Sequence, residues 1–212
     1  MVEQIHAEPV VLSRKSSELY RTNPKHLVFL LSRYKFCAKL LEGHDQVIEL
    51  GCGDGFGSAI VAAAVNTLIC TDIDEASLED NQRRKTAPEN VSFEYFDFRE
   101  KPYPTPVNSI YTIDVIEHIF PEEEPKVMAN VAKSLKDDGV LIIGTPNKSA
   151  EPYASEWSKA GHVNLKTLSS LRELSLSYFH NVFMFGMNDE VVHTGFPEMC
   201  HFLWALCVTP RR

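Results

Sequence analysis

A glycine-rich run preceded by an acid is the segment of this sequence best suited to bind a ligand. Residues 47–57 read VIELGCGDGFG and place a glycine at positions 51, 53, 55 and 57. Glycine lets a backbone turn tightly and approach a ligand closely. In an open α/β sheet such a loop lies at the carboxyl ends of the strands, where ligands bind. Glu49 would repel a pyrophosphate by its like charge, so the run favours a ligand that carries positive charge.

Two further acids follow the loop at the ends of predicted strands. Asp72 stands 21 residues after Gly51, a position from which a carboxylate accepts hydrogen bonds from both hydroxyls of a ribose. Asp97 ends the next strand and could accept one from the exocyclic amine of adenine. A dinucleotide loop would need glycine or alanine where Phe56 stands, and a P-loop would need a following Gly-Lys-Ser/Thr. The loop and its acids therefore predict a site for a cationic nucleoside.

Groups that could move a proton or hold a metal follow the fourth and fifth predicted strands. Residues 114–119 read DVIEHI, and residues 161–165 read GHVNL. A neutral imidazole, with a pKa of about 6.5, can take a proton at pH 7, which makes His118 and His162 candidate bases, with Glu117 next to His118. Together with Asp114 they also form a set of two carboxylates and two imidazoles that suits Mg²⁺, Mn²⁺, Fe²⁺ or Zn²⁺.

Strands and helices alternate along the chain in the order that would bring these segments together. The apolar spacing predicts strands at 46–50, 67–71, 91–96, 109–113 and 140–143, then a strand pair at 182–185 and 202–208. Helices are predicted from Asn23-Pro24 to Gly43 and at 58–65, 75–85, 122–135 and 165–178. The pattern predicts an α/β fold with a doubly wound, mostly parallel seven-stranded sheet and an antiparallel C-terminal hairpin. We expect an N-terminal arm or lid at 1–22 and a single domain at 23–212.

These motifs together resemble the class I S-adenosylmethionine-dependent methyltransferases, which have a Rossmann-like domain. The resemblance rests on VIELGCGDGFG (47–57), TDID (71–74), FDF (96–98), DVIEHI (114–119) and GVLIIGTPN (139–147), and it covers about residues 24–210. In that family the glycine loop lies under the methionine part of the cofactor, and the acids ending the second and third strands hold the ribose and the adenine. The resemblance implies S-adenosyl-L-methionine as cofactor, S-adenosyl-L-homocysteine as product, and a cofactor site formed by Glu49, Gly51, Cys52, Gly53, Asp72, Ile73, Asp97, Phe98 and Asp114.

The resemblance also places residues 161–165 over the substrate, beside the Glu117-His118 pair. We predict a catalytic group of His118, His162 and Glu117, in which an imidazole serves as the base without a metal. A divalent metal held by Asp114, Glu117, His118 and His162 is the alternative, and it resembles the site of small-RNA methyltransferases. Their first ligand is glutamate, and the shorter Asp114 puts the full set in doubt. A structural role for the Glu117–His118 pair also stays open.

The relatives that share the Glu-His and Gly-His-Val pattern include O-methyltransferases of quinone pathways, sugars and secondary metabolites. The resemblance therefore implies O-methylation of a small molecule. An RNA 2′-O-methyltransferase is one alternative, but a net charge of −8 and the lack of a basic stripe count against nucleic acid as a partner. A non-catalytic cofactor-binding subunit is another, but it would have no need of the intact loop and acids.

Composition limits the remaining possibilities. With 212 residues, 44% of them hydrophobic and 24% charged, the chain has the profile of a globular protein. Its five cysteines form no CxxC pair, which favours reduced thiols in the cytoplasm. The sequence lacks the apolar core of a signal peptide and any run of about 18 apolar residues. We expect a cytoplasmic protein with a small-molecule acceptor and no membrane partner. The composition does not predict an oligomeric state.

Overall fold

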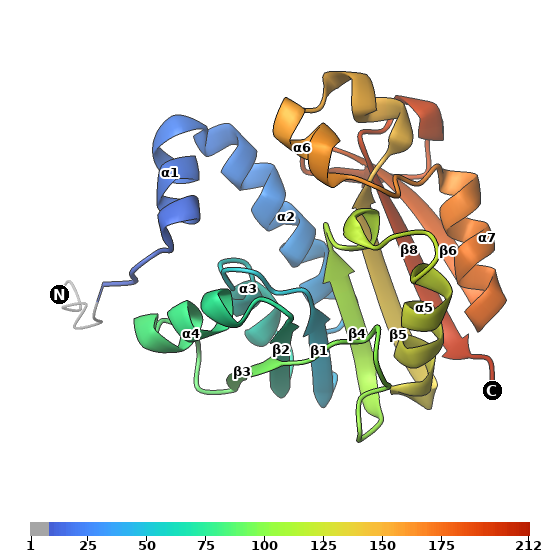
Figure 1. Ribbon diagram of the computed structural model, residues 1–212, viewed down its shortest axis with the longest axis horizontal. Helices are drawn as coiled ribbons and strands as arrows, with labels where there is room; N and C mark the ends of the chain where they lie inside the picture. Colours follow the sequence, from blue (N-terminus) through green and yellow to red (C-terminus); the bar gives the residue numbers. More distant parts are fainter. Residues whose placement is uncertain (1–8) are drawn as a thin grey trace, which may run out of the picture.

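An eight-stranded sheet forms the centre of the structure, a computed structural model that describes residues 9–212 (Figure 1). The strand order is β3-β2-β1-β4-β5-β8-β6-β7, and the first five strands in this order run parallel. The last three pair antiparallel with their neighbours. The strands are β1 (Gln46–Leu50), β2 (Thr67–Asp72), β3 (Val91–Tyr95), β4 (Val107–Ile113), β5 (Leu135–Pro146), β6 (Phe179–Asn188), β7 (Val191–His193) and β8 (Phe202–Pro210).

Helices cover both faces of this sheet. Successive residues of the central strands enter two different hydrophobic clusters, as the two-residue period of a strand requires. Helices α2 (Pro24–Leu40), α3 (Ser58–Ala62) and α4 (Glu75–Arg84) pack into one cluster, and α5 (Glu124–Lys133) and α7 (Leu168–Tyr178) into the other. The remaining elements are α1 (Arg14–Thr22), α6 (Glu156–Gly161) and three short 3₁₀ turns, η1 (Ile116–His118), η2 (Lys148–Tyr153) and η3 (Pro197–Met199). Within residues 9–212, no helix combines the length and apolarity needed to cross a bilayer.

The order of elements confirms the doubly wound sheet predicted from the sequence, with three differences. The sheet has eight strands instead of seven, because a three-residue edge strand, β7, pairs with the end of β6. A strand this short carries no visible periodicity. Strand β5 begins at Leu135 rather than at 140, because Leu135 already pairs with Val107 of β4. The segment after β5, predicted as a polar loop, contains η2 and α6.

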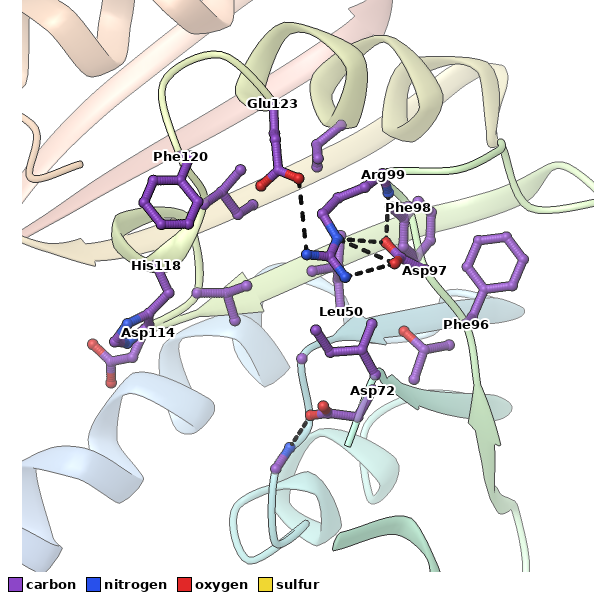
Figure 2. A pocket seen from close by; sticks show the side chains of 17 residues that line it. Leu50, Asp72, Phe96, Asp97, Phe98, Arg99, Asp114, His118, Phe120 and Glu123 are labelled. Carbon is purple, nitrogen blue, oxygen red and sulfur yellow. Dashed lines mark hydrogen bonds and ion pairs between the residues drawn. The ribbon is translucent and has the colours of Figure 1, made fainter. Parts of the chain in front are cut away.

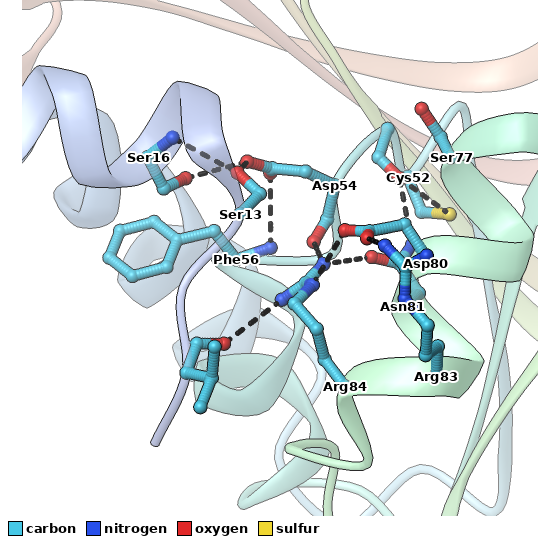
Figure 3. A network of polar contacts seen from close by, with 12 residues as sticks. Ser13, Ser16, Cys52, Asp54, Phe56, Ser77, Asp80, Asn81, Arg83 and Arg84 are labelled. Atoms are coloured by element: carbon cyan, nitrogen blue, oxygen red, sulfur yellow. Dashed lines mark hydrogen bonds and ion pairs between the residues drawn. The ribbon is translucent and has the colours of Figure 1, made fainter. Parts of the chain in front are cut away.

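The described part of the predicted N-terminal arm is the helix α1, and a polar network attaches it to the glycine loop (Figure 3). Ser13 caps α1 and also donates a hydrogen bond to the Asp54 carboxylate, while the Ser16 hydroxyl donates to the same oxygen at 2.6 Å. The Arg84 guanidinium donates to the backbone oxygens of Asp54, at 2.6 Å, and Val11, at 3.4 Å. Residues 1–8 of the predicted arm lie outside the described residues.

We predict that Asp54→Ala loosens α1 without disturbing the sheet. The substitution removes two hydrogen bonds to a charged acceptor, worth about 1.5–3 kcal/mol each when shielded from water. Because this site is only partly buried, we expect backbone amides of α1 to exchange about tenfold faster, measured by hydrogen–deuterium exchange. Asp137→Ala removes an exposed carboxylate on β5 and is the control. Unchanged exchange in α1 of the Asp54→Ala variant would show that the network does not hold the helix.

Candidate functional site

A cavity of about 350 Å³ opens at the carboxyl ends of β1, β2 and β4 (Figure 2). Strand order reverses here, because β1 lies between β2 and β4 and the loops after β1 and β4 lead in opposite directions. Open α/β sheets bind their ligands at such a switch point. The cavity is lined by residues at the ends of β1 and β2, by residues of the segments that follow β1, β2, β3 and β4, and by one residue of α5: Leu50, Gly51, Gly53, Thr71, Asp72, Ile73, Phe96, Asp97, Phe98, Arg99, Asp114, Val115, His118, Ile119, Phe120, Glu123 and Val127.

Gly51 allows the glycine loop to lie directly against the turn that follows β4. Its φ angle is +78°, in the left-handed region that favours glycine. A Cβ atom at this position would stand 2.4 Å from a methyl carbon of Val115. Any side chain here would therefore push the two loops apart and widen the floor of the cavity.

Asp72 stabilises the same loop and faces the cavity. One carboxylate oxygen accepts a hydrogen bond from the backbone N–H of Gly53 at 2.7 Å. The other accepts one from the backbone N–H of Asp74 at 2.9 Å. Each oxygen keeps further lone pairs for a ligand. A carboxylate in this place, at the end of the second strand, suits the pair of hydroxyls of a ribose.

Glu49 and Cys52, both predicted at the cofactor, are not among the residues that line the cavity. Glu49 points to the face of β1 opposite Leu50, where its carboxylate accepts hydrogen bonds from Ser58 Oγ at 2.5 Å and Cys70 Sγ at 3.4 Å. Burial raises the pKa of Glu49 to about 7, against hydrogen bonds that lower it. The structure therefore places this acid behind the loop, and Cys52 is buried there as well.

The far end of the cavity carries the acid predicted to meet adenine. Asp97 is buried, and both of its carboxylate oxygens accept hydrogen bonds from the guanidinium of Arg99. These bonds hold the pKa of Asp97 below its usual value. Phe98 lines the cavity next to it, and so does Ile73, which directly follows β2 and has half of its surface exposed. The apolar walls and the carboxylate together suit a flat base with an amino group.

Asp114 lies at the other end, and a buried arginine holds its carboxylate. The Asp114 backbone has a φ of +56°, an unusual conformation for a residue with a side chain. Arg33 of α2 forms an ion pair with Asp114, and its guanidinium carbon lies 3.8 Å from the ring centroid of Phe202. Asp114 lines the cavity, but its charge is balanced by the protein itself.

Glu117, His118 and His162 come together directly behind Asp114. One possible ligand atom from each lies within 4.8 Å of the other two. Glu117 is fully buried, with one oxygen accepting a hydrogen bond from Thr145 Oγ1 at 2.9 Å and the other without a partner among the described residues. Burial, and then the charge of Asp114, raises the pKa of Glu117 to about 8. Burial thus disfavours the charged form of Glu117.

A hydrogen bond orients the imidazole of His118. The Nδ1 atom of His118 lies 2.9 Å from the carbonyl oxygen of Gly161, and because a carbonyl can only accept, Nδ1 carries the proton. The Nε2 atom of His118 is then a free acceptor in the neutral ring. The His162 ring lies edge-on to it, with 5.1 Å between centroids, and burial followed by the neighbouring His118 lowers the pKa of His162.

Two backbone hydrogen bonds hold residues 161–165 against residues 114–119. The N–H groups of Val163 and Asn164 both donate to the carbonyl oxygen of Glu117, at 2.9 and 3.0 Å. His118 lines the cavity, whereas Glu117 and His162 lie behind it. Of the sequence-predicted site residues, the structure thus gathers Gly51, Gly53, Asp72, Ile73, Asp97, Phe98, Asp114 and His118 around one cavity.

Sequence reasoning missed the two arginines of the site and the hydroxyl that holds Glu117. Arg33 lies 81 residues from its partner Asp114, on a helix whose spacing indicates only core packing. Thr145 is a fully buried strand residue that no pattern distinguishes from its neighbours. Arg99 does have a signal, since it follows Asp97 by two residues and could have been considered as its partner.

Comparison with known proteins gives the site a family. Residues 41–183 match a family model described as a methyltransferase domain. A "probable S-adenosylmethionine-dependent methyltransferase" of Mycolicibacterium smegmatis is 28% identical over 116 residues, which cover 54% of this chain and 43% of the relative. One of Mycobacterium tuberculosis is 28% identical over 104 residues, 49% of this chain and 36% of the relative. The matched segments thus span less than half the length of these curated relatives.

Solved structures share the fold at low sequence identity. The N-methyltransferase NodS from Bradyrhizobium japonicum WM9, in complex with S-adenosyl-L-homocysteine, has a TM-score of 0.65 at 15% identity and covers 91% of both chains. The methyltransferase domain of bacterial CtHen1-C has a TM-score of 0.70 at 16% identity, covering 86% of this chain and 100% of that one. The likeness shows that the doubly wound sheet of this chain is that of class I methyltransferases.

We predict that Glu49→Gln changes the pH dependence of stability in the ligand-free protein. Because the folded pKa of Glu49 lies near 7 and its ordinary value is 4.5, the native state holds a proton that the unfolded chain releases. Stability of the wild type therefore falls as pH rises from about 5 to 8. Glutamine has no proton to lose in this range. The free energy of unfolding of the variant should therefore rise relative to wild type by up to about 3 kcal/mol between pH 5 and pH 8.

Urea unfolding at pH 5 and pH 8 measures this difference. Glu42→Gln, at an exposed carboxylate near the end of α2, is the control and should follow the wild type at both pH values. A difference between Glu49→Gln and wild type that is the same at both pH values would contradict the raised pKa.

Proposed function

This chain belongs to the class I S-adenosylmethionine-dependent methyltransferases, and on that premise we propose that it transfers the methyl group to a hydroxyl of a small molecule. The observation that carries the proposal is one cavity with Asp72 and Asp97 at two neighbouring strand ends and His118 at the other end. The first two suit a nucleoside, and the third is a base that can approach the transferred group. The cofactor supplies an electrophilic methyl group on a positively charged sulfur.

We place the ribose at Asp72, the adenine at Asp97 and Phe98, and the methionine part along Gly51 and Gly53. The cavity volume of about 350 Å³ lies within the ordinary range for small-ligand sites. The left-handed glycines bring backbone close to the ligand without obstruction from a Cβ atom. The methyl group would then point toward the side of the cavity that His118 lines.

His118 is the base in this proposal. Its Nδ1–H is held by Gly161, so Nε2 is the atom that takes the proton of the acceptor hydroxyl. The bound cofactor would supply the methyl group to the acceptor oxygen, with its sulfur as the leaving group that keeps the electron pair. His162, with its lowered pKa, stays neutral beside His118 and does not repel the imidazolium that forms. Burial favours the neutral form of Glu117, which would add no charge near the sulfonium.

A divalent cation at Glu117, His118 and His162 is the second candidate. The unpartnered oxygen of Glu117 and the free Nε2 of His118 fit it, and such a donor set suits a first-row metal or Mg²⁺. A bound cation would ionise Glu117 and lower the pKa of the acceptor hydroxyl. Asp114, a fourth ligand in the sequence-based alternative, is paired with Arg33 and does not join the three. We retain the metal-free base as the proposal.

The acceptor class and the compartment are proposals of the same kind. The net charge of −8 disfavours a nucleic-acid acceptor, so a small molecule is retained over RNA. All five cysteines are buried free thiols, which suits a reducing cytoplasm.

We predict that Asp72→Ala weakens binding of S-adenosylhomocysteine by about ten- to a hundredfold. The substitution removes charge-assisted hydrogen bonds to the ribose, each worth about 1.5–3 kcal/mol. Glu75→Ala removes a carboxylate three residues on that does not line the cavity, and it should bind as wild type does. Calorimetry gives both affinities. Wild type that binds NAD and neither S-adenosylmethionine nor S-adenosylhomocysteine would refute the proposed cofactor.

We predict that methyl transfer survives exhaustive chelation but not the loss of His118. A positioned general base contributes about 10²–10⁴-fold, so His118→Ala should lose that much turnover while retaining affinity for S-adenosylhomocysteine. Transfer from labelled S-adenosylmethionine to a panel of hydroxylated small molecules gives the rates. Activity that disappears with chelator and returns only with added divalent metal would contradict the metal-free base and support the metal site of Glu117, His118 and His162.

A further inference from the structure

A set of three charged side chains closes the adenine end of the cavity (Figure 2). Asp97 follows β3, Arg99 comes two residues later, and Glu123 precedes α5. Arg99 Nη2 donates to one Asp97 oxygen at 2.7 Å, and Nε lies 3.0 and 3.1 Å from the two oxygens. On the other side, Arg99 Nη1 lies 3.9 Å from Glu123 Oε1. All three residues line the cavity.

Arg99 occupies nearly all of the hydrogen-bonding capacity of Asp97. A carboxylate accepts about four hydrogen bonds. Besides the guanidinium, the backbone N–H of Arg99 donates to Asp97 Oδ1 at 2.8 Å, an oxygen that also accepts from Nε. An adenine amino group that approaches Asp97 must therefore share the carboxylate with the guanidinium. Arg99 fixes the plane of the carboxylate before any ligand arrives.

The guanidinium has freedom to move, whereas the carboxylate does not. The side chain of Asp97 is 8% exposed and that of Arg99 is 41% exposed. Glu123, itself 37% exposed, gives the guanidinium a second partner within a short displacement, because 3.9 Å is longer than a hydrogen bond. If the guanidinium turned toward Glu123, one Asp97 oxygen would become available inside the cavity without leaving Arg99 unpaired.

We propose that Arg99 is a positioning residue for adenine recognition. Arg99 orients the Asp97 carboxylate for the 6-amino group of adenine. When the amino group binds, the Arg99 guanidinium turns to Glu123, which accepts a hydrogen bond from it. The proposal rests on the cofactor placement proposed above. In this proposal Asp97, Arg99 and Glu123 discriminate between 6-amino and 6-oxo purines. An oxygen at position 6 carries no hydrogen and could not donate a hydrogen bond to the Asp97 carboxylate.

The comparison of two ligands separates this role from a general structural one. S-adenosyl-L-homocysteine carries the 6-amino group, and S-inosyl-L-homocysteine carries a 6-oxo group in its place. We expect wild type to prefer the first by at least about tenfold, the value of one hydrogen bond to a charged group. Arg99→Ala should lose about tenfold in affinity for the amino ligand and little for the oxo ligand, so that the preference falls toward one.

Three further variants complete the experiment by calorimetry on the full chain. Arg99→Lys restores charge but not the two-pronged geometry, so it should recover only part of the preference. Glu123→Gln should lower the preference less than Arg99→Ala does. Lys39→Ala removes one positive charge from an exposed pair on α2 and should behave as wild type.

The outcomes are distinguishable from failure of the cofactor proposal. Equal losses for both ligands in Arg99→Ala, or no loss for either, would overturn the role of Arg99. If Asp97→Asn keeps the full wild-type preference, adenine does not meet Asp97, and the inference falls with that placement. Wild type that binds neither ligand would refute the cofactor assignment itself, and this inference with it.

Discussion

The contact between Gly51 and Val115 is the constraint on which the rest of the site depends. Strands β1 and β4 are neighbours in the sheet, but the loops that leave them belong to different halves of the fold. With no Cβ atom at Gly51, the first loop lies flat against the turn after β4. This approach brings Asp72 at the end of β2, Asp97 after β3 and His118 after β4 to the walls of one cavity. The two halves of the cavity are continuous because the Gly51 backbone can lie against the side chain of Val115.

The acids around this cavity are stabilised in different ways, and the difference suits their different roles. Asp72 is held by backbone N–H groups and stays open to a neutral sugar. The charges of Asp97 and Asp114 are balanced by Arg99 and Arg33. Glu117 is buried, and burial followed by the charge of Asp114 raises its pKa to about 8. In the cofactor site proposed here, most of the negative charge is therefore already compensated, so hydrogen bonds would position a cationic cofactor more than net charge would.

The sequence allowed the sheet and the position of the site to be predicted, because both follow from local patterns. Buried parallel strands are continuous apolar runs. Gly51 and Asp72 stand directly at the ends of β1 and β2, and Asp97 lies two residues after β3. The edge strand β7 escaped prediction because three residues show no period. Arg33 and Thr145 escaped because each acts through a partner far away in the chain. The side of β1 on which Glu49 falls was also hidden, since a strand buried on both faces has no polar face to reveal its orientation.

A crystal structure of the chain with S-adenosylhomocysteine tests the central claim most directly. The account predicts ribose hydroxyls on the Asp72 carboxylate, the adenine amino group on Asp97 with Arg99 turned toward Glu123, and the sulfur facing Nε2 of His118. A ligand bound elsewhere would contradict it, for example in the hollow that Arg14 of α1 and Asp80 of α4 line together. So would a ligand bound with its sulfur directed away from His118.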